Sequence, residues 1–201
     1  MRGMQLDLHG LAARKSDPAA GAAVAVTAAQ GAALLTMSLR YVAPRAADTV
    51  TAALRAAEKS IDAFAGMPRR DGACFAPVAA ALAMVQGDEA ARDARAEALA
   101  RALPGASAVL EELVEQVGRV LAAAVPAAPS IPAAVAGDCA VAVELLRAAA
   151  HSAALLARSN ATLFRNEAQA LELVERFEAA EAEAERHAHA LRAVLDLRLT
   201  R

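Results

Sequence analysis

Apolar residues recur along this chain at intervals of three and four, the spacing of one face of an α-helix. Nowhere do apolar and polar residues alternate over a useful length, and no Asn-Gly or Asp-Gly turn joins two such stretches, so no strand is expected. The pattern therefore predicts an all-α fold. Helices are expected over about residues 4–14, 18–43, 46–65, 71–87, 88–124, 138–160 and 164–197.

Proline and glycine set the expected boundaries between these helices. Gly66-Met67-Pro68 is expected to stop the third helix, Pro77 to kink the fourth, and Pro104-Gly105 to break or bend the fifth. Val125 to Asp138 carries three prolines and is expected to be a long loop. The sequence thus predicts one domain over residues 1–201, a bundle of about seven helices that ends in a long charged helix.

The stretch from Ser16 to Met37 is built almost entirely from small side chains and contains no charge after Asp17. It is long enough to cross a membrane, but membrane spans depend on Leu, Ile, Phe and Val rather than Ala. A helix capped at Asp17-Pro18 and buried in the bundle is favoured, with a dimer seam or a ligand-facing surface as alternatives. Its small residues at helical spacing form a small-residue ridge: Gly21, Ala25, Ala28, Ala29 and Ala32.

Composition narrows the classes of function. The chain is 57% hydrophobic but only 2% aromatic, so each helix buries little area and further stabilisation by oligomerisation is expected. A formal charge of −2 gives no basic surface for nucleic acid, and stacking aromatics are scarce. Cys74 and Cys139 are too few for a disulfide framework or a zinc site and are expected to be reduced thiols. With no secretory signal at the N-terminus, a soluble cytoplasmic protein is expected.

Few residues carry obvious chemistry. His187 and His189 are two positions apart on a helix and point to different faces, and His151 is expected to be an interior residue of an apolar helix. The acidic run from Glu178 to Arg186 is typical of a solvated helix face. No phosphate loop, nucleophile elbow or set of metal ligands is found, so no metal is expected.

Two aspartates stand out because each precedes an apolar stretch, Asp71 in DGACF and Asp138 in GDCAV. Either could be an ordinary N-cap that accepts backbone N–H groups. Either could also face a cationic ligand and exchange protons with it. Their spacing does not decide between these interpretations.

Four motifs in order resemble the cyclodeaminase and methenyltetrahydrofolate cyclohydrolase family, small all-helical folate enzymes that also occur fused to formiminotransferase domains. A helix-opening Pro-Gly-Gly-Gly-Ser is echoed by Pro18-Ala19-Ala20-Gly21-Ala22, and an Asp-x-x-Ala-Phe-x-x-Val by Asp71 to Val78. RAEALARALP from Arg95 to Pro104 echoes a third motif. The two ends of a fourth family helix are echoed by GDCAVAV and by SAALLARSN, which ends at Asn160. The chain departs from the family at Ala19, Ala20, Ala22 and Leu156, where the family has two Gly, a Ser and an Asn.

The resemblance implies opening or closing of the one-carbon bridge between N5 and N10 of tetrahydrofolate, without a metal or second cofactor. Asp71 and Asp138 would stabilise the cationic carbon and take a proton from water, and Asn160 would orient the pterin. It also implies a homodimer with the ligand near its interface. The alternative is a catalytically inactive or repurposed helical dimer that acts as a binding or structural protein. The remaining substrate-binding candidates are Pro18 and Gly21 at the helix opening, and Arg40 and Arg45 for the glutamate tail.

Overall fold

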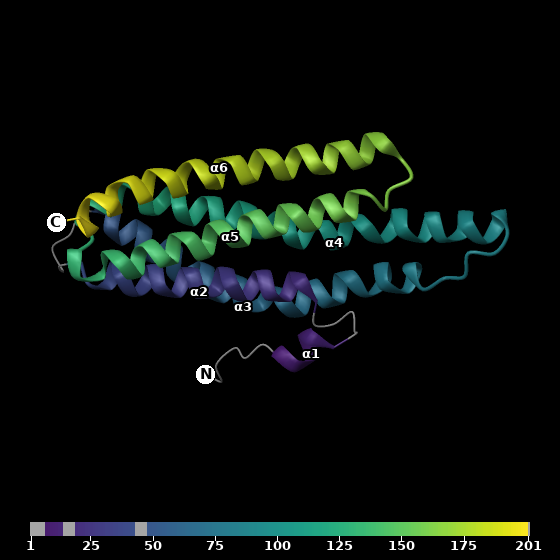
Figure 1. The fold of residues 1–201 in the computed structure, drawn as a ribbon, viewed down its shortest axis with the longest axis horizontal. Helices are drawn as coiled ribbons and strands as arrows, with labels where there is room; N and C mark the ends of the chain where they lie inside the picture. The colour runs from purple at the N-terminus through teal and green to yellow at the C-terminus, as the bar shows by residue number, and fades with distance from the viewer. Residues whose placement is uncertain (1–6, 14–18, 43–47, 201) are drawn as a thin grey trace.

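The structure, a computed structural model, describes residues 7–13, 19–42 and 48–200. These residues form six α-helices and two short 3-10 helices, with no strand in the described ranges, which confirms the all-α prediction. The five long helices lie side by side along the long axis of the molecule (Figure 1). The elements are α1 (Leu8–Ala12), α2 (Ala20–Arg40), α3 (Asp48–Leu82), α4 (Glu89–Ala124), η1 (Val125–Ser130), η2 (Ala133–Val135), α5 (Ala136–Ala161) and α6 (Glu167–Leu199).

The expected break at Pro68 is wrong, because α3 continues through both Pro68 and Pro77. Pro104 likewise lies inside α4, so of the expected break or bend at this position the break is wrong. A proline in a helix interior costs about 3 kcal/mol. Here burial offsets that cost, since Phe64 and Met67 on either side of the Gly66 position are fully buried in the main core. Two predicted helices therefore merge, and six are found instead of about seven.

The other boundaries are closer to expectation. The expected loop from Val125 to Asp138 is folded into η1 and η2, so that α5 begins at Ala136. α2 begins after Ala19, which has no side chain able to cap it. The expected cap at Asp17-Pro18 lies outside the described residues, as does the start of the first predicted helix.

α2 packs between α3 and α5. Ala25, Ala28 and Ala32 of the small-residue ridge are at most 1% exposed. At Gly31 the backbone approaches α5 so closely that a Cβ would lie 2.8 Å from the Leu146 side chain. The buried-helix interpretation is confirmed, and the ridge is not an exposed dimer seam.

Two helical segments, Ala20–Arg40 and Ala133–Ala161, are long and apolar enough to cross a membrane. Of their most apolar windows, 61% and 50% is buried inside the bundle. Burial of this kind is typical of core helices in a water-soluble protein, which fits the composition argument against a membrane span.

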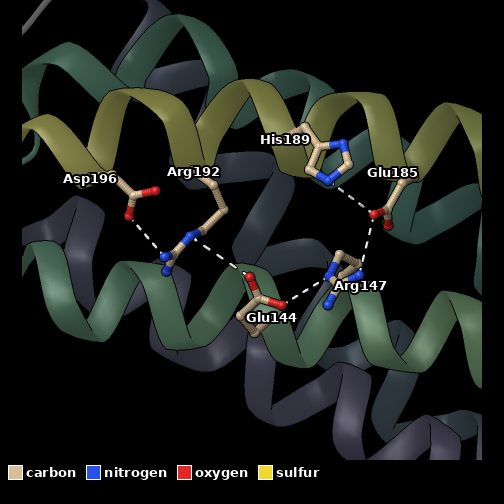
Figure 2. Close-up of polar contacts among 6 residues, drawn as sticks. All are labelled: Glu144, Arg147, Glu185, His189, Arg192 and Asp196. Carbon is tan, nitrogen blue, oxygen red and sulfur yellow. Dashed lines mark hydrogen bonds and ion pairs between the residues drawn. The ribbon is translucent and has the colours of Figure 1, made fainter.

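The charged C-terminal helix α6 lies against α5 through a chain of ion pairs (Figure 2). Glu144 of α5 contacts Arg147 at 2.8 Å and Arg192 at 3.7 Å, and Arg147 reaches Glu185 at 3.2 Å. His151 is exposed rather than interior, with its Nδ1 atom 2.5 Å from Glu181. Acidic residues of α6 thus form ion pairs with basic residues of α5, in addition to facing solvent.

α3 and α4 form a long hairpin whose tip projects beyond the ends of the other helices (Figure 1). A second, smaller core lies within it, around Val78, Leu99 and Leu103. Because α2 begins part-way along this hairpin, its N-terminus faces the side of α3 rather than the end of the bundle. A small cavity lies at that junction.

Candidate functional site

The cavity, about 170 Å³ in volume, lies where the first turn of α2 meets α3, α4 and the last turns of α5. Its wall is mostly apolar, and its polar groups come from Asp71, Ser159 and Asn160. The complete lining is Ala19, Ala20, Gly21, Asp71, Phe75, Ala106, Leu110, Leu156, Ser159 and Asn160. We call this the Asp71 cavity.

Asp71 reaches this cavity from the middle of α3, so it does not cap a helix of its own. Its carboxylate lies against Gly21, the second residue of α2, so closely that a Cβ there would be under 3.0 Å from both carboxylate oxygens. The first N–H groups of a helix have no partners within it, and the helix dipole favours negative charge at this end. Asp71 therefore places its carboxylate at the end of α2 where the helix dipole favours negative charge.

The opposite wall is formed by the C-terminal part of α5. Leu156 and Asn160 are one turn apart and both line the cavity, as their four-residue spacing requires. Asn160 is 9% exposed, and the motif ending at Asn160 thus reaches the same cavity as Asp71 and Gly21. Three of the residues singled out from the sequence are brought together here.

Sequence reasoning missed Phe75, Ser159, Ala106 and Leu110. Phe75 could have been found, because it follows Asp71 by four residues and shares its helix face. Ser159 adjoins Asn160 in the same motif. Ala106 and Leu110 come from α4, whose approach to the site depends on the hairpin and leaves no signal in the local sequence.

Asp138 does not line the Asp71 cavity, so the two aspartates that the resemblance assigns to one ligand do not meet within one chain. It lies in the first turn of α5, with Val135 as the N-cap, whereas Asn160 lies in the last turn. A separation of 22 residues along a helix is about 33 Å at 1.5 Å per residue. The Asp138 side chain is exposed at the far end of the bundle.

Arg40 is likewise remote from the cavity, 19 residues and about 28 Å along α2 from Gly21. It pairs with Glu58 of α3 at 2.7 Å and borders a separate surface hollow of about 380 Å³ with Tyr41 and Ile61. Arg40 and Asp138 thus lie toward the same end of the antiparallel pair α2 and α5. Pro18 and Arg45 lie outside the described residues.

Both cysteines are free thiols and do not form a disulfide. Cys139 is fully buried, and burial raises its pKa from 9.0 to about 11, against a smaller opposing effect of a hydrogen bond with Ser38. Cys74 is half-buried. In the described ranges no three His, Cys, Asp or Glu side chains lie together as metal ligands. The chemistry available in the Asp71 cavity is that of one carboxylate, one amide and one hydroxyl.

Comparison with known proteins places the fold. The model of a family described as formiminotransferase-cyclodeaminase matches residues 7–179. The chain belongs to this family. Among solved structures, formiminotetrahydrofolate cyclodeaminase from Thermotoga maritima superposes with a TM-score of 0.78 over 96% of both chains, at 19% sequence identity. A search of the curated proteins gives no match. The cyclodeaminase-like helical fold expected from the motifs is confirmed.

Proposed function

We propose that this protein acts on the one-carbon bridge between N5 and N10 of a tetrahydrofolate derivative, with the Asp71 cavity as its reaction site. The supporting observation is that Gly21, Asp71 and Asn160, drawn from three separated motifs, line one cavity. Family membership supports a folate-related chemistry for this fold. The proposed substrate is a folate-type small molecule, and the proposed location is the cytoplasm.

Asp71 is the proposed catalytic group. The methenyl carbon is part of a cationic amidinium system, so an ionised carboxylate beside it lowers the energy of the bound cation. The same carboxylate can accept a proton from an attacking water or return one to a leaving nitrogen. Asn160 is proposed to hold the pterin, because an amide offers both a donor and an acceptor to a heterocycle edge. No metal or second cofactor enters this scheme.

The cavity size limits what it holds. Small-molecule sites usually measure about 300–1,000 Å³, and the Asp71 cavity has about 170 Å³. We infer that it takes the ring system near the one-carbon bridge and that the remainder of the ligand lies outside it. Arg40 lies about 28 Å along α2 from Gly21, so it is not placed to meet a tail that leaves this cavity within one chain.

Incubation of the purified protein with methenyltetrahydrofolate tests the proposal. The near-UV absorbance of the methenyl bridge should fall faster than in buffer alone, in proportion to protein concentration. An unchanged rate together with no detectable binding would reject the proposal.

The competing function is a catalytically inactive or repurposed dimer of the same fold. The residues that favour it line the cavity: Ala19, Ala20 and Leu156 stand where the resemblance expects two glycines and an asparagine. Methyl groups at the two alanines narrow the approach of a ligand to the backbone. Under this alternative Asp71 serves only to stabilise the N-terminus of α2, and the absorbance assay distinguishes the two.

We further propose that the protein is a homodimer through the outer faces of α2 and α5. α2 carries no charged residue between its first residue and Arg40, including its partly exposed face. On the outer face of α5, Val141 is 51% exposed and Leu155 is 50% exposed. An uncharged face across two adjacent helices is typical of contacts between copies of a chain.

A further inference from the structure

A second pocket, about 280 Å³ in volume, lies near the start of α4 and is lined by three arginines. Arg92 and Arg95 come from α4, and Arg165 comes from the segment between α5 and α6. Gln86 completes the polar rim, and the floor is apolar: Ala96, Leu99, Leu163 and Phe164. We call this the arginine pocket.

The arginine pocket is distinct from the Asp71 cavity. Arg95 precedes Ala106, which lines that cavity, by 11 residues, about 16 Å along α4. The two sites share no lining residue. The two sites are therefore separate, and binding of an anion at the arginine pocket can be tested without a folate.

The charges of the arginine pocket are poorly compensated. Arg165 contacts Asp93 at 2.6 Å. Within the described residues no carboxylate pairs with Arg92 or Arg95, and no carboxylate lines the pocket. Like charges gathered at one pocket repel one another, and an anion bound among them relieves that repulsion.

Arg95 adds a second, independent observation. Its Nε atom is buried and has no hydrogen-bond partner. Leaving a buried donor unsatisfied costs about 1–3 kcal/mol, and more when the group is charged. A guanidinium binds carboxylate or phosphate through two parallel hydrogen bonds from a pair of its N–H groups.

We propose that the arginine pocket binds an oxyanion carried by a small molecule, a phosphate or a pair of carboxylates. The guanidinium of Arg95 attracts the anion from the pocket wall, and Arg92 supplies further positive charge at the rim. Arg165 is shared between the anion and Asp93. The apolar floor accommodates the carbon skeleton of the ligand.

Calorimetric titration of the intact protein at low ionic strength tests this, with inorganic phosphate in one arm and glutarate in the other. Binding of either probe with a millimolar or tighter dissociation constant is expected, and the arm that binds tells which oxyanion the pocket takes. Arg95→Met should weaken that binding about tenfold or more, and Asp93→Asn should strengthen it by releasing Arg165. Arg101→Met is the matched control, because Arg101 is exposed on the same helix and pairs with Glu97 at 3.6 Å.

Absence of binding in both arms overturns the proposal. So does binding that Arg95→Met leaves unchanged while its melting temperature matches that of the unaltered protein. If Arg95→Met does not fold, Arg92→Met at an exposed position replaces it and should weaken binding several-fold. None of these outcomes depends on folate turnover, so this proposal and the proposed function can fail separately.

Discussion

At Gly21 the backbone of α2 comes so close to the Asp71 carboxylate that a methyl group has no room. This contact explains why position 21, next to Ala20, is a glycine. Ala19 and Ala20 line the same cavity. The glycine at position 21 leaves the room in which the Asp71 carboxylate lies.

Gly21→Ala should destabilise the protein by about 1–3 kcal/mol, because its methyl group overpacks against Asp71. Thermal or urea unfolding measures the change. Gly66→Ala is the control: at this exposed position of α3 a Cβ meets nothing within 4 Å, and the substitution should stabilise by about 0.5–1 kcal/mol. Combining Gly21→Ala with Asp71→Ala should recover part of the loss, and strict additivity of the two would contradict a direct contact.

The two thiols should differ in reactivity. Burial raises the pKa of Cys139 to about 11, so at pH 8 its thiol is neutral and shielded. A chromogenic disulfide reagent should then label at most one cysteine in the folded protein and both after denaturation. The raised pKa also means that the unfolded chain loses this proton first, so stability should fall as the pH rises from about 9 toward 11. Rapid labelling of both thiols in the native state would contradict the buried position of Cys139.

Among the helices, the sequence predicted the bounds of α2, α5 and α6 to within a few residues. Apolar residues recur at helical spacing throughout each of them, and the composition changes near each end. The predicted helix end at Pro68 was wrong because the local preference of proline was considered without the burial of Phe64 and Met67 beside it. Tertiary packing outweighs local preference when a helix is long and covered on one side by neighbours. The same error allowed Asp71 to be interpreted as an N-cap, one of the two interpretations left open, whereas the helix continues through it.

The packing of α3 against α4 includes a two-point ion pair between Arg70 and Glu112, with nitrogen-to-oxygen distances of 3.0 and 2.5 Å. The hydrogen bond from Arg70 lowers the pKa of the Glu112 carboxyl below its ordinary value of 4.5. A lowered folded-state pKa contributes stability that is present above about pH 4.5 and is lost as the pH falls through the folded value.

Glu112→Gln should therefore cost about 0.2–1 kcal/mol at pH 7, a small amount because both side chains are about half exposed. The difference between variant and unaltered protein should shrink below pH 4.5 and at high salt. Urea unfolding at several pH values measures it. Glu175→Gln on the exposed side of α6 serves as control and should change little; an equal loss from both would contradict a specific role for the pair.

For the whole molecule, the sequence predicted the fold class. The family motifs around Gly21, Asp71 and Asn160 pointed to three residues that line one cavity. The same resemblance grouped Asp138 with them. Which end of one helix meets which end of another depends on topology, and α5 carries Asp138 and Asn160 at opposite ends.

Asp138→Asn should consequently leave the turnover of methenyltetrahydrofolate within about twofold of the unaltered protein, since about 33 Å of helix separates it from Asn160. The same absorbance assay measures this. A large loss of rate with unchanged melting temperature would mean that a second copy of the chain brings its own Asp138 to the cavity.

The proposed dimer gives a separate test. Val141→Glu combined with Leu155→Glu should convert a dimer to a monomer, because both side chains are about half exposed on the proposed interface and charge there is costly to bury. Light scattering gives the molar mass. Ala148, also exposed on α5, offers a milder Ala148→Ser control. A monomer in the unaltered protein would contradict the proposed interface.

The most direct test of the proposed function is the rate of loss of methenyltetrahydrofolate absorbance for Asp71→Asn beside Asp62→Asn. Both substitutions remove one negative charge from α3, but Asp62 is exposed and does not line the Asp71 cavity. Asp71→Asn should slow turnover by about 100-fold or more, the usual contribution of a proton-transferring group, and Asp62→Asn should leave it nearly unchanged. Equal rates for the two variants, with both proteins folded, would contradict the assignment of the reaction to Asp71.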